Sequence, residues 1–213
     1  MRWKYKLQII EFIILFFGLP VFFYFVDFQF PVAILLPVFL FILIILHRTR
    51  SFIWKELIHW SIKKSIVKYQ FYVVLLSCFT LLVAVVMFIP KELFNLPLQN
   101  TRMWVLLCLM YPMYSVFAQE VIFRTFIYHR YKNIFVKPYM FIIASGVSFS
   151  FVHILYYSFV SVFLTLLLGI YLAYIYRKTR SVLFTSILHS VLGNFAFTVG
   201  LGQYFFNGLH SLL

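Results

Sequence analysis

The chain contains seven apolar runs, each close to the length that a helix needs to cross a bilayer. A spanning helix needs about 20 mainly apolar residues, and backbone groups in lipid must bond within the segment, so each run is predicted to be a helix. With 64% hydrophobic and 11% charged residues, a soluble domain of this length could not hide its apolar surface from water. We therefore predict an all-α fold, a polytopic transmembrane helix bundle of about seven spans. The predicted spans are residues 7–26, 29–46, 71–89, 103–128, 138–157, 159–176 and 181–206.

The basic residues indicate how the spans are oriented. If seven spans alternate from a cytoplasmic N-terminus, Lys91 and Arg102 fall on the far side, and the other 16 of the 18 Lys and Arg fall on the cytoplasmic side. This distribution explains the net charge of +13 by contact with anionic lipid headgroups. No small-residue cleavage site follows the first apolar run, so we expect it to be retained. We predict an integral protein of a bacterial inner (plasma) membrane, partnered by the lipid bilayer and not by nucleic acid.

The stretch 51–70, between the second and third spans, mixes apolar and charged residues. Leu57 and Trp60 are interleaved with Lys55 and Glu56. This pattern favours one amphipathic helix lying on the cytoplasmic face, an interfacial helix; a simple polar linker is the alternative. We expect the whole chain, 1–213, to form a single membrane domain.

Polar residues within the spans are concentrated in the second half of the chain. Ionisable side chains are costly at bilayer depth, which makes each one a candidate for a functional site. Of the five acidic residues, only Glu120 lies deep inside a long apolar stretch. We expect the polar groups to face one another around a small wet cavity. The candidates are Gln119, Glu120 and Arg124 in the fourth span, His153 in the fifth, and His189 and Asn194 in the seventh.

A carboxylate and two imidazoles in a partly dry site are sufficient for amide hydrolysis without a metal ion. A buried carboxylate can deprotonate a water, and an imidazole can share that work. A second imidazole and an amide N–H can stabilise the oxyanion that forms when water attacks a peptide carbonyl. We expect no cofactor and no metal, because no HExxH pattern places two ligands on one helix face.

Each candidate also has a structural interpretation. Glu120 and Arg124 are four residues apart on one helix and can form a structural ion pair. His153 or His189 can be a hydrogen-bonded core histidine, and Asn194 can bond a neighbouring helix. The same polar groups could also serve a small proton-coupled transporter, which the weak internal symmetry disfavours. These alternatives remain open at this point.

Two spacings predict irregular helices. His153 lies sixteen residues after Lys137, about 24 Å along a helix, so the fifth span must begin outside the bilayer, tilt strongly or unwind. Asn194 is five residues after His189 and points about 140° away from it in a regular helix. It can reach the other polar groups only if the helix bulges or breaks at Gly193.

Three motifs resemble the CAAX-protease and bacteriocin-processing family of intramembrane glutamate proteases. They are Gln119-Glu120-x-x-x-Arg124, Phe149-x-x-x-His153, and His189 with nearby Asn194. The resemblance covers residues 112–206, within a predicted catalytic core of 103–206, and does not extend to residues 1–102. The chain departs from the family's usual pattern at two positions. Gln119 replaces the first of two adjacent glutamates, and Gly193 occupies the position, four residues after the histidine, where the family usually has asparagine.

The resemblance implies a multi-helix membrane endopeptidase without metal or nucleotide. In that reading Glu120 and His153 activate water, and Arg124 positions the carboxylate. His189, with Asn194, holds the oxyanion. We therefore predict a metal-independent intramembrane endopeptidase that hydrolyses a peptide bond in a membrane-anchored or lipidated peptide near the cytoplasmic face. The alternative is a catalytically degraded binding or immunity protein on the same fold, which is motivated by Gln119.

Overall fold

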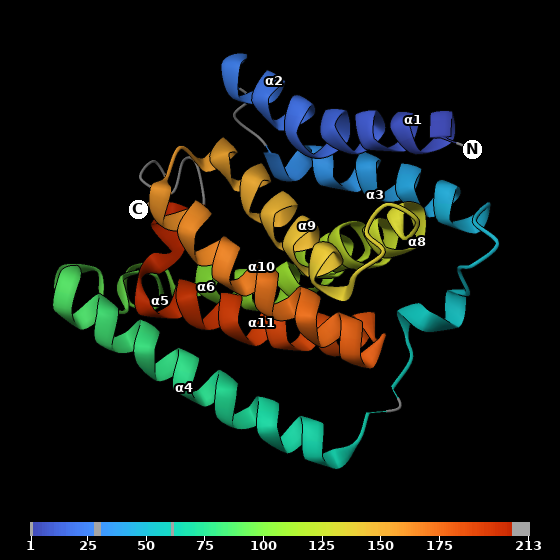
Figure 1. Ribbon diagram of the computed structural model, residues 1–213. Helices are drawn as coiled ribbons and strands as arrows, with labels where there is room; N and C mark the ends of the chain where they lie inside the picture. The colour runs from blue at the N-terminus through green and yellow to red at the C-terminus, as the bar shows by residue number, and fades with distance from the viewer. Residues whose placement is uncertain (1, 28–30, 61, 206–213) are drawn as a thin grey trace.

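The computed structural model describes residues 2–27, 31–60 and 62–205, and these residues form a bundle of helices (Figure 1). Within this part of the chain, six helices are long and apolar enough to cross a membrane. This confirms the polytopic helical bundle predicted from the sequence. The second predicted span corresponds to a shorter apolar helix, α3 (Pro31–His47). The six longer helices are Tyr5–Phe25, Lys64–Phe88, Thr101–Tyr131, Pro138–Tyr156, Phe159–Thr179 and Val182–Val199.

Several of these spans are built from consecutive helical segments. The first consists of α1 (Arg2–Ile13), a π-helical turn and α2 (Leu19–Phe25). The span 101–131 alternates between α and π geometry. Its segments are α6 (Thr101–Met110), a π segment (Tyr111–Val116), α7 (Phe117–Glu120), a second π segment (Val121–Phe126) and α8 (Ile127–Tyr131). The other helices are α4 (Lys64–Phe88), α5 (Asn95–Gln99), α9 (Pro138–Phe151), α10 (Phe159–Thr179) and α11 (Val182–Val199).

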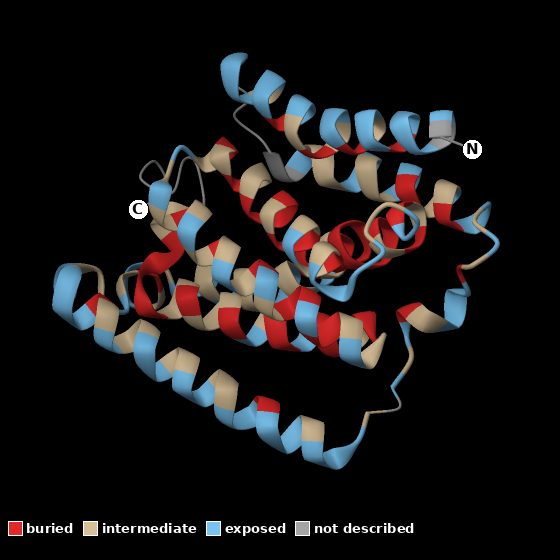
Figure 2. Cartoon of the chain, viewed as in Figure 1, coloured by how far each residue is buried: buried red, intermediate tan, exposed pale blue. Residues whose placement is uncertain are grey.

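The helices of the second half of the chain lie mainly in the middle of the bundle (Figure 1). Figure 1 shows α1, α2 and α3 along one side of the molecule and α4 along the opposite side, with α9, α10 and α11 between them. Buried residues gather in the central helices, whereas α4 is mostly exposed (Figure 2). Because α4 is one of the apolar spans, its exposed outer face suits contact with lipid.

The predicted interfacial helix is not formed. Between α3 and α4 the described residues contain one short 3-10 turn, Trp54–Leu57, and the end of the predicted segment belongs to α4. Side-chain contacts tie this connection to the bundle, because Phe52 and Leu57 are buried in the core. The Ser181 hydroxyl also donates to the backbone carbonyl of His59 at 2.6 Å. Such a tethered path prevents one continuous amphipathic helix from lying flat.

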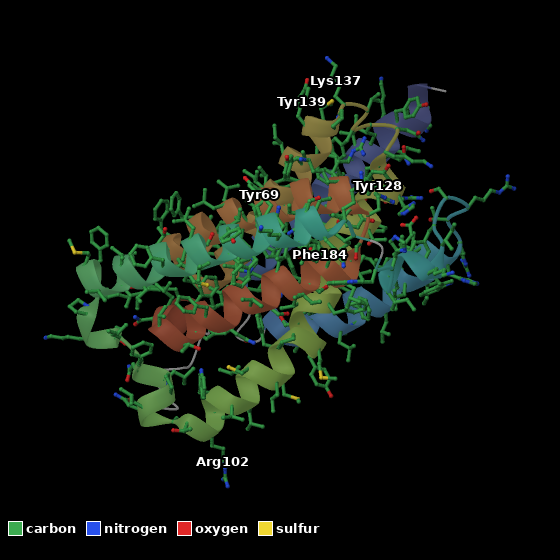
Figure 3. All side chains as sticks on the ribbon, turned by 90° about the horizontal axis from the view of Figure 1, so that it is seen from below. Tyr69, Arg102, Tyr128, Lys137, Tyr139 and Phe184 are labelled. Carbon is green, nitrogen blue, oxygen red and sulfur yellow. The ribbon has the colours of Figure 1, made fainter. Side chains whose placement is uncertain are left out.

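Glu56 anchors the same connection through a polar cluster. Its Oε2 lies 2.9 Å from the His129 imidazole and accepts from Arg180 at 3.1 Å. The Ser51 hydroxyl lies 3.0 Å from the other His129 nitrogen. The Arg180 guanidinium also stacks over the ring of Tyr128 at 3.4 Å, and Figure 3 labels this tyrosine. The cluster therefore joins the ends of α8 and α10 to a loop from the first half of the chain.

A close approach of two helices holds α9 against α10. Gly146 and Gly169 face each other, and a Cβ built on Gly169 would lie 2.9 Å from the carbonyl oxygen of Gly146. Small residues allow membrane helices to approach closely enough for backbone contact. Because Phe149 and His153 follow Gly146 along the same span, this contact also positions the candidate site.

We expect Gly169→Val to lower the free energy of unfolding by about 1–3 kcal/mol, because the added side chain overpacks the contact between α9 and α10. Thermal or denaturant unfolding in detergent micelles measures this loss. Gly18→Ala is the matched control, since a Cβ there would lie 3.8 Å from the carbonyl oxygen of Ile13, an ordinary van der Waals contact. A Gly169→Val protein as stable as the wild type would contradict the proposed close packing.

Candidate active site

Glu120 lies at the centre of the site, at the end of α7 and between the two π segments. Its side chain and that of Arg124 are fully buried, with no exposed surface. The Arg124 Nε donates to Glu120 Oε2 at 3.1 Å. A second guanidinium nitrogen donates to the Ser145 hydroxyl at 2.7 Å, and that hydroxyl donates to the carbonyl of Phe123. The predicted ion pair therefore exists, and it connects the span 101–131 to α9.

His189 brings a third helix to the same carboxylate. Its Nδ1 lies 3.0 Å from Glu120 Oε1. Since an ionised carboxylate only accepts hydrogen bonds, His189 carries its proton on Nδ1, and Nε2 is the second functional nitrogen. Both oxygens of Glu120 are thus engaged, one by Arg124 and the other chiefly by His189. A buried carboxylate with these partners avoids the cost of an unpaired charge.

His153 lies where the fifth span changes geometry. α9 ends at Phe151 and continues as a 3-10 segment, Val152–Tyr156. The predicted irregularity therefore takes the form of a tightened last part of the helix. His153 Nδ1 lies 2.7 Å from the carbonyl oxygen of Phe149. Because a carbonyl can only accept, the proton sits on Nδ1 and Nε2 presents a lone pair, the form that a general base requires.

The ring of Phe149 connects the charged and imidazole groups. It contacts His153 with ring centroids 4.9 Å apart and His189 at 5.4 Å. The Arg124 guanidinium lies over the same ring, 5.0 Å from its centroid. Phe149 was part of the motif used for the family resemblance, and its position explains why a large aromatic suits this residue.

A cavity of about 810 Å³ opens beside these groups. Its wall includes His153, His189 and Gln119. Neither Glu120 nor Arg124 lines the cavity. Gln119 is held by a hydrogen bond from its amide nitrogen to the Ser115 hydroxyl at 2.7 Å. The rest of the wall is mainly apolar and comes from α4, α6, α10 and α11. The expected convergence of three helices on one cavity is present, but the carboxylate lies behind the wall.

Asn194 does not join this group. α11 runs as a regular α-helix through Gly193, so the bulge that would turn Asn194 towards the cavity is not formed. Its amide instead donates to the carbonyl oxygen of Cys108 at 3.1 Å. That carbonyl is four residues before Pro112, which has no N–H to bond it. Asn194 thus satisfies a backbone acceptor that proline leaves free, and it joins α11 to α6.

Tyr111 is a site residue that the sequence reasoning missed. Its hydroxyl lies 3.1 Å from His189 Nε2 and its ring lines the cavity. A signal was present, because Tyr111, Ser115 and Gln119 follow at intervals of four in the fourth span, as residues on one helix face do. Ser145 was also missed, although it precedes His153 by two helical turns.

No metal centre is evident in the part of the chain that the structure describes. No group of three or more His, Cys, Asp or Glu side chains there is arranged to hold a metal ion. The polar groups around the cavity are hydrogen-bond donors, acceptors and imidazoles, which suits proton transfer to and from a bound substrate.

A comparison with known protein families finds a match that covers part of the chain. Residues 101–195 match the family described as type II CAAX prenyl endopeptidase Rce1-like. The match includes Gln119, Glu120, Arg124, His153 and His189, and it confirms the family resemblance predicted from the sequence. No curated protein and no solved structure matches the chain.

Proposed function

Because residues 101–195 form an Rce1-like region in a membrane protein, we propose that this protein is a metal-independent intramembrane endopeptidase. It hydrolyses a peptide bond in a lipid-anchored or membrane-embedded peptide. The observation that carries this proposal is the His153 imidazole, which lines the cavity with its lone-pair nitrogen unbonded by the described residues. His189 lines the same cavity and is fixed by the buried carboxylate of Glu120.

His153 acts as the general base in this proposal. A water in the cavity gives a proton to His153 Nε2 while its oxygen attacks the peptide carbonyl carbon, which produces a tetrahedral oxyanion. The oxyanion then collapses, the C–N bond breaks, and the leaving nitrogen takes the proton from His153. The base is regenerated, and the products are one carboxylic acid and one amine.

Glu120 has a positioning role in this scheme. The family resemblance implies water activation by Glu120 together with His153, but the two oxygens of Glu120 are bonded to Arg124 and His189. A carboxylate in that position orients the second imidazole and compensates the Arg124 charge. We therefore assign proton transfer to His153, and assign to Glu120 the orientation of His189.

The position of the site along its helix supports cleavage near one membrane face. Glu120 is eleven residues from Tyr131, where the span 101–131 ends, which corresponds to about 16 Å of helix. The other end of the same span, Thr101, is about 28 Å away. Arg130 and Lys132 lie at the nearer end, which the positive-inside pattern assigns to the cytoplasm.

Reconstituted wild-type protein tests this function directly. Proteoliposomes are given an internally quenched peptide with a prenylated CAAX end, and in parallel the same peptide without the prenyl group. Products are identified by mass spectrometry, and empty liposomes serve as the control. We expect a single cut near the peptide's lipid anchor, in the presence of chelators. If neither peptide is cut, and membranes with and without the protein yield the same native peptides, the endopeptidase proposal is wrong.

A second candidate function is favoured by Gln119. This residue lies on the cavity wall where a carboxylate could face a bound water, and an amide cannot take a proton. The protein would then bind a membrane peptide without cutting it. In that case a bound peptide should be recovered intact with the wild-type protein.

We expect Gln119→Glu to increase the cleavage rate by about tenfold or more, because a carboxylate at this position adds a base to the cavity that His153 also lines. The rate of cleavage of the same quenched peptides is the measurement. If the wild type shows no cleavage and Gln119→Glu does, the binding function is the natural one. If Gln119→Glu changes nothing and the wild type is active, His153 needs no carboxylate beside it.

A further inference from the structure

We propose that Tyr111 is a further catalytic residue, whose hydroxyl donates a hydrogen bond to the oxyanion formed in the cavity. This inference rests on the proposed endopeptidase function and adds a group to its site. Tyr111 begins the π segment Tyr111–Val116, on a different helix from His189. Its hydroxyl is 3.1 Å from His189 Nε2, and its ring lines the same cavity as His153.

The ring of Tyr111 is held tightly in place. A Cβ built on Gly193 would lie 2.6 Å from both the Tyr111 Cε1 and its hydroxyl oxygen, so the phenol occupies space that any other residue at 193 would fill. Phe197, one turn further along α11, packs edge-on against the ring with centroids 5.0 Å apart. The absence of a side chain at 193 and the presence of one at 197 together fix where the hydroxyl lies.

The π geometry of the fourth span contributes to this placement. The Phe117 N–H bonds to the carbonyl of Pro112, five residues earlier, instead of the usual four. The wider turn changes the rotation of residues before it relative to those after it. As a result Tyr111, Ser115 and Gln119 all reach the wall of one cavity.

The Tyr111 hydroxyl is a hydrogen-bond donor, so its proton is available to bond an oxyanion in the cavity. His189 carries its proton on Nδ1, towards Glu120, so its Nε2 can only accept, and Tyr111 is the donor of the bond between them. The hydroxyl hydrogen can rotate about the Cζ–O bond. When a substrate oxygen in the cavity becomes negatively charged, it is a stronger acceptor than a neutral imidazole, and the hydrogen turns towards it. No covalent bond changes at Tyr111, and the proton stays on its oxygen.

Gly193 explains why a tyrosine is used. Position 193 is one turn after His189 and is the place on α11 from which a side-chain amide would reach the same part of the cavity. Here no side chain from α11 occupies that volume, and the phenol of Tyr111 from the fourth span fills it. The structure therefore supplies the second donor from another helix, which no motif spacing on α11 alone reveals.

The test compares steady-state cleavage of the quenched peptides by the wild type and four variants in proteoliposomes. Tyr111→Phe should lower kcat by about 10²-fold with KM unchanged, as for loss of one oxyanion donor. Tyr72→Phe, on the exposed face of α4, is the matched control and should behave as wild type. Tyr111→Ala should also be slow, and Tyr111→Ala combined with Gly193→Asn should recover part of kcat, because an amide enters the vacated space.

The outcomes separate this inference from the function on which it rests. If Tyr111→Phe keeps the wild-type kcat, or raises KM with kcat unchanged, Tyr111 is not an oxyanion donor, while cleavage by the wild type still supports the endopeptidase. If the Tyr111→Phe protein does not fold, the protein with both Tyr111→Ala and Gly193→Asn provides the test. A cleavage rate of that protein no higher than the rate of Tyr111→Ala alone rejects the inference. A wild-type protein without any cleavage rejects both.

Discussion

Replacing His153 by alanine should lower the rate of peptide cleavage by about 10³-fold, the largest effect that we expect on activity. His153 is the imidazole whose Nδ1 is committed to a backbone carbonyl and whose Nε2 is free to take a proton from water. Without it, the described cavity wall retains Gln119, which cannot accept a proton, and His189, which is bonded on both nitrogens. The measurement is turnover of the quenched peptides in proteoliposomes.

Two controls make this result specific. His47→Ala removes an exposed imidazole that is bonded to Trp54 and does not line the cavity, so it should leave turnover unchanged. Free imidazole should restore part of the rate to His153→Ala, because the enlarged cavity can admit a base of the missing shape. Turnover within a fewfold of wild type in His153→Ala would show that the base is another group, and the proposed mechanism would be wrong.

Replacing Arg124 by methionine should have the largest effect on stability, with a loss of about 3–5 kcal/mol in the free energy of unfolding. The guanidinium is fully buried and bonded to both Glu120 and Ser145. Its removal leaves a buried carboxylate without its principal cation, and membrane or protein interior offers no water to replace it. Denaturant unfolding in mixed micelles measures the loss, and Arg102→Met is the control because that arginine is exposed.

The combination of Arg124→Met with Glu120→Gln tests the reason for that loss. When both charges are absent, no unpaired ion is buried, so the doubly substituted protein should be more stable than Arg124→Met alone. If the two proteins are equally unstable, packing and not charge explains the effect of Arg124. An Arg124→Met protein within about 1 kcal/mol of wild type would contradict a buried ion pair altogether.

The sequence predicted the architecture well because that part of the problem is local. A run of about 20 apolar residues forms a helix in lipid whatever its neighbours do, since only internal hydrogen bonds satisfy its backbone. The polar residues of the second half were equally informative. Glu120, Arg124 and His189 meet as expected, and His153 shares a cavity wall with His189, because lipid would reject any of these groups facing outward.

The connection between α3 and α4 shows where such reasoning fails. Its alternation of apolar and charged residues predicted a surface helix, but Glu56 finds His129 and Arg180 far along the chain. Pattern alone does not reveal those partners, since they are 73 and 124 residues away. Three-dimensional partners determined the path of this segment more strongly than its amphipathic periodicity did.

Composition, apolar periodicity and motif order were therefore enough to predict a helical membrane protein, the resemblance of residues 101–195 to the Rce1-like family, and a cavity shared by polar groups from three helices. They could not tell which of two adjacent side chains faces that cavity, because a helical register changed by π turns is decided by packing. The folded bundle places Gln119 on the wall and Glu120 behind it. It also directs Asn194 to a carbonyl released by Pro112 and seats Tyr111 against Gly193, contacts that depend on how helices distant in sequence pack together.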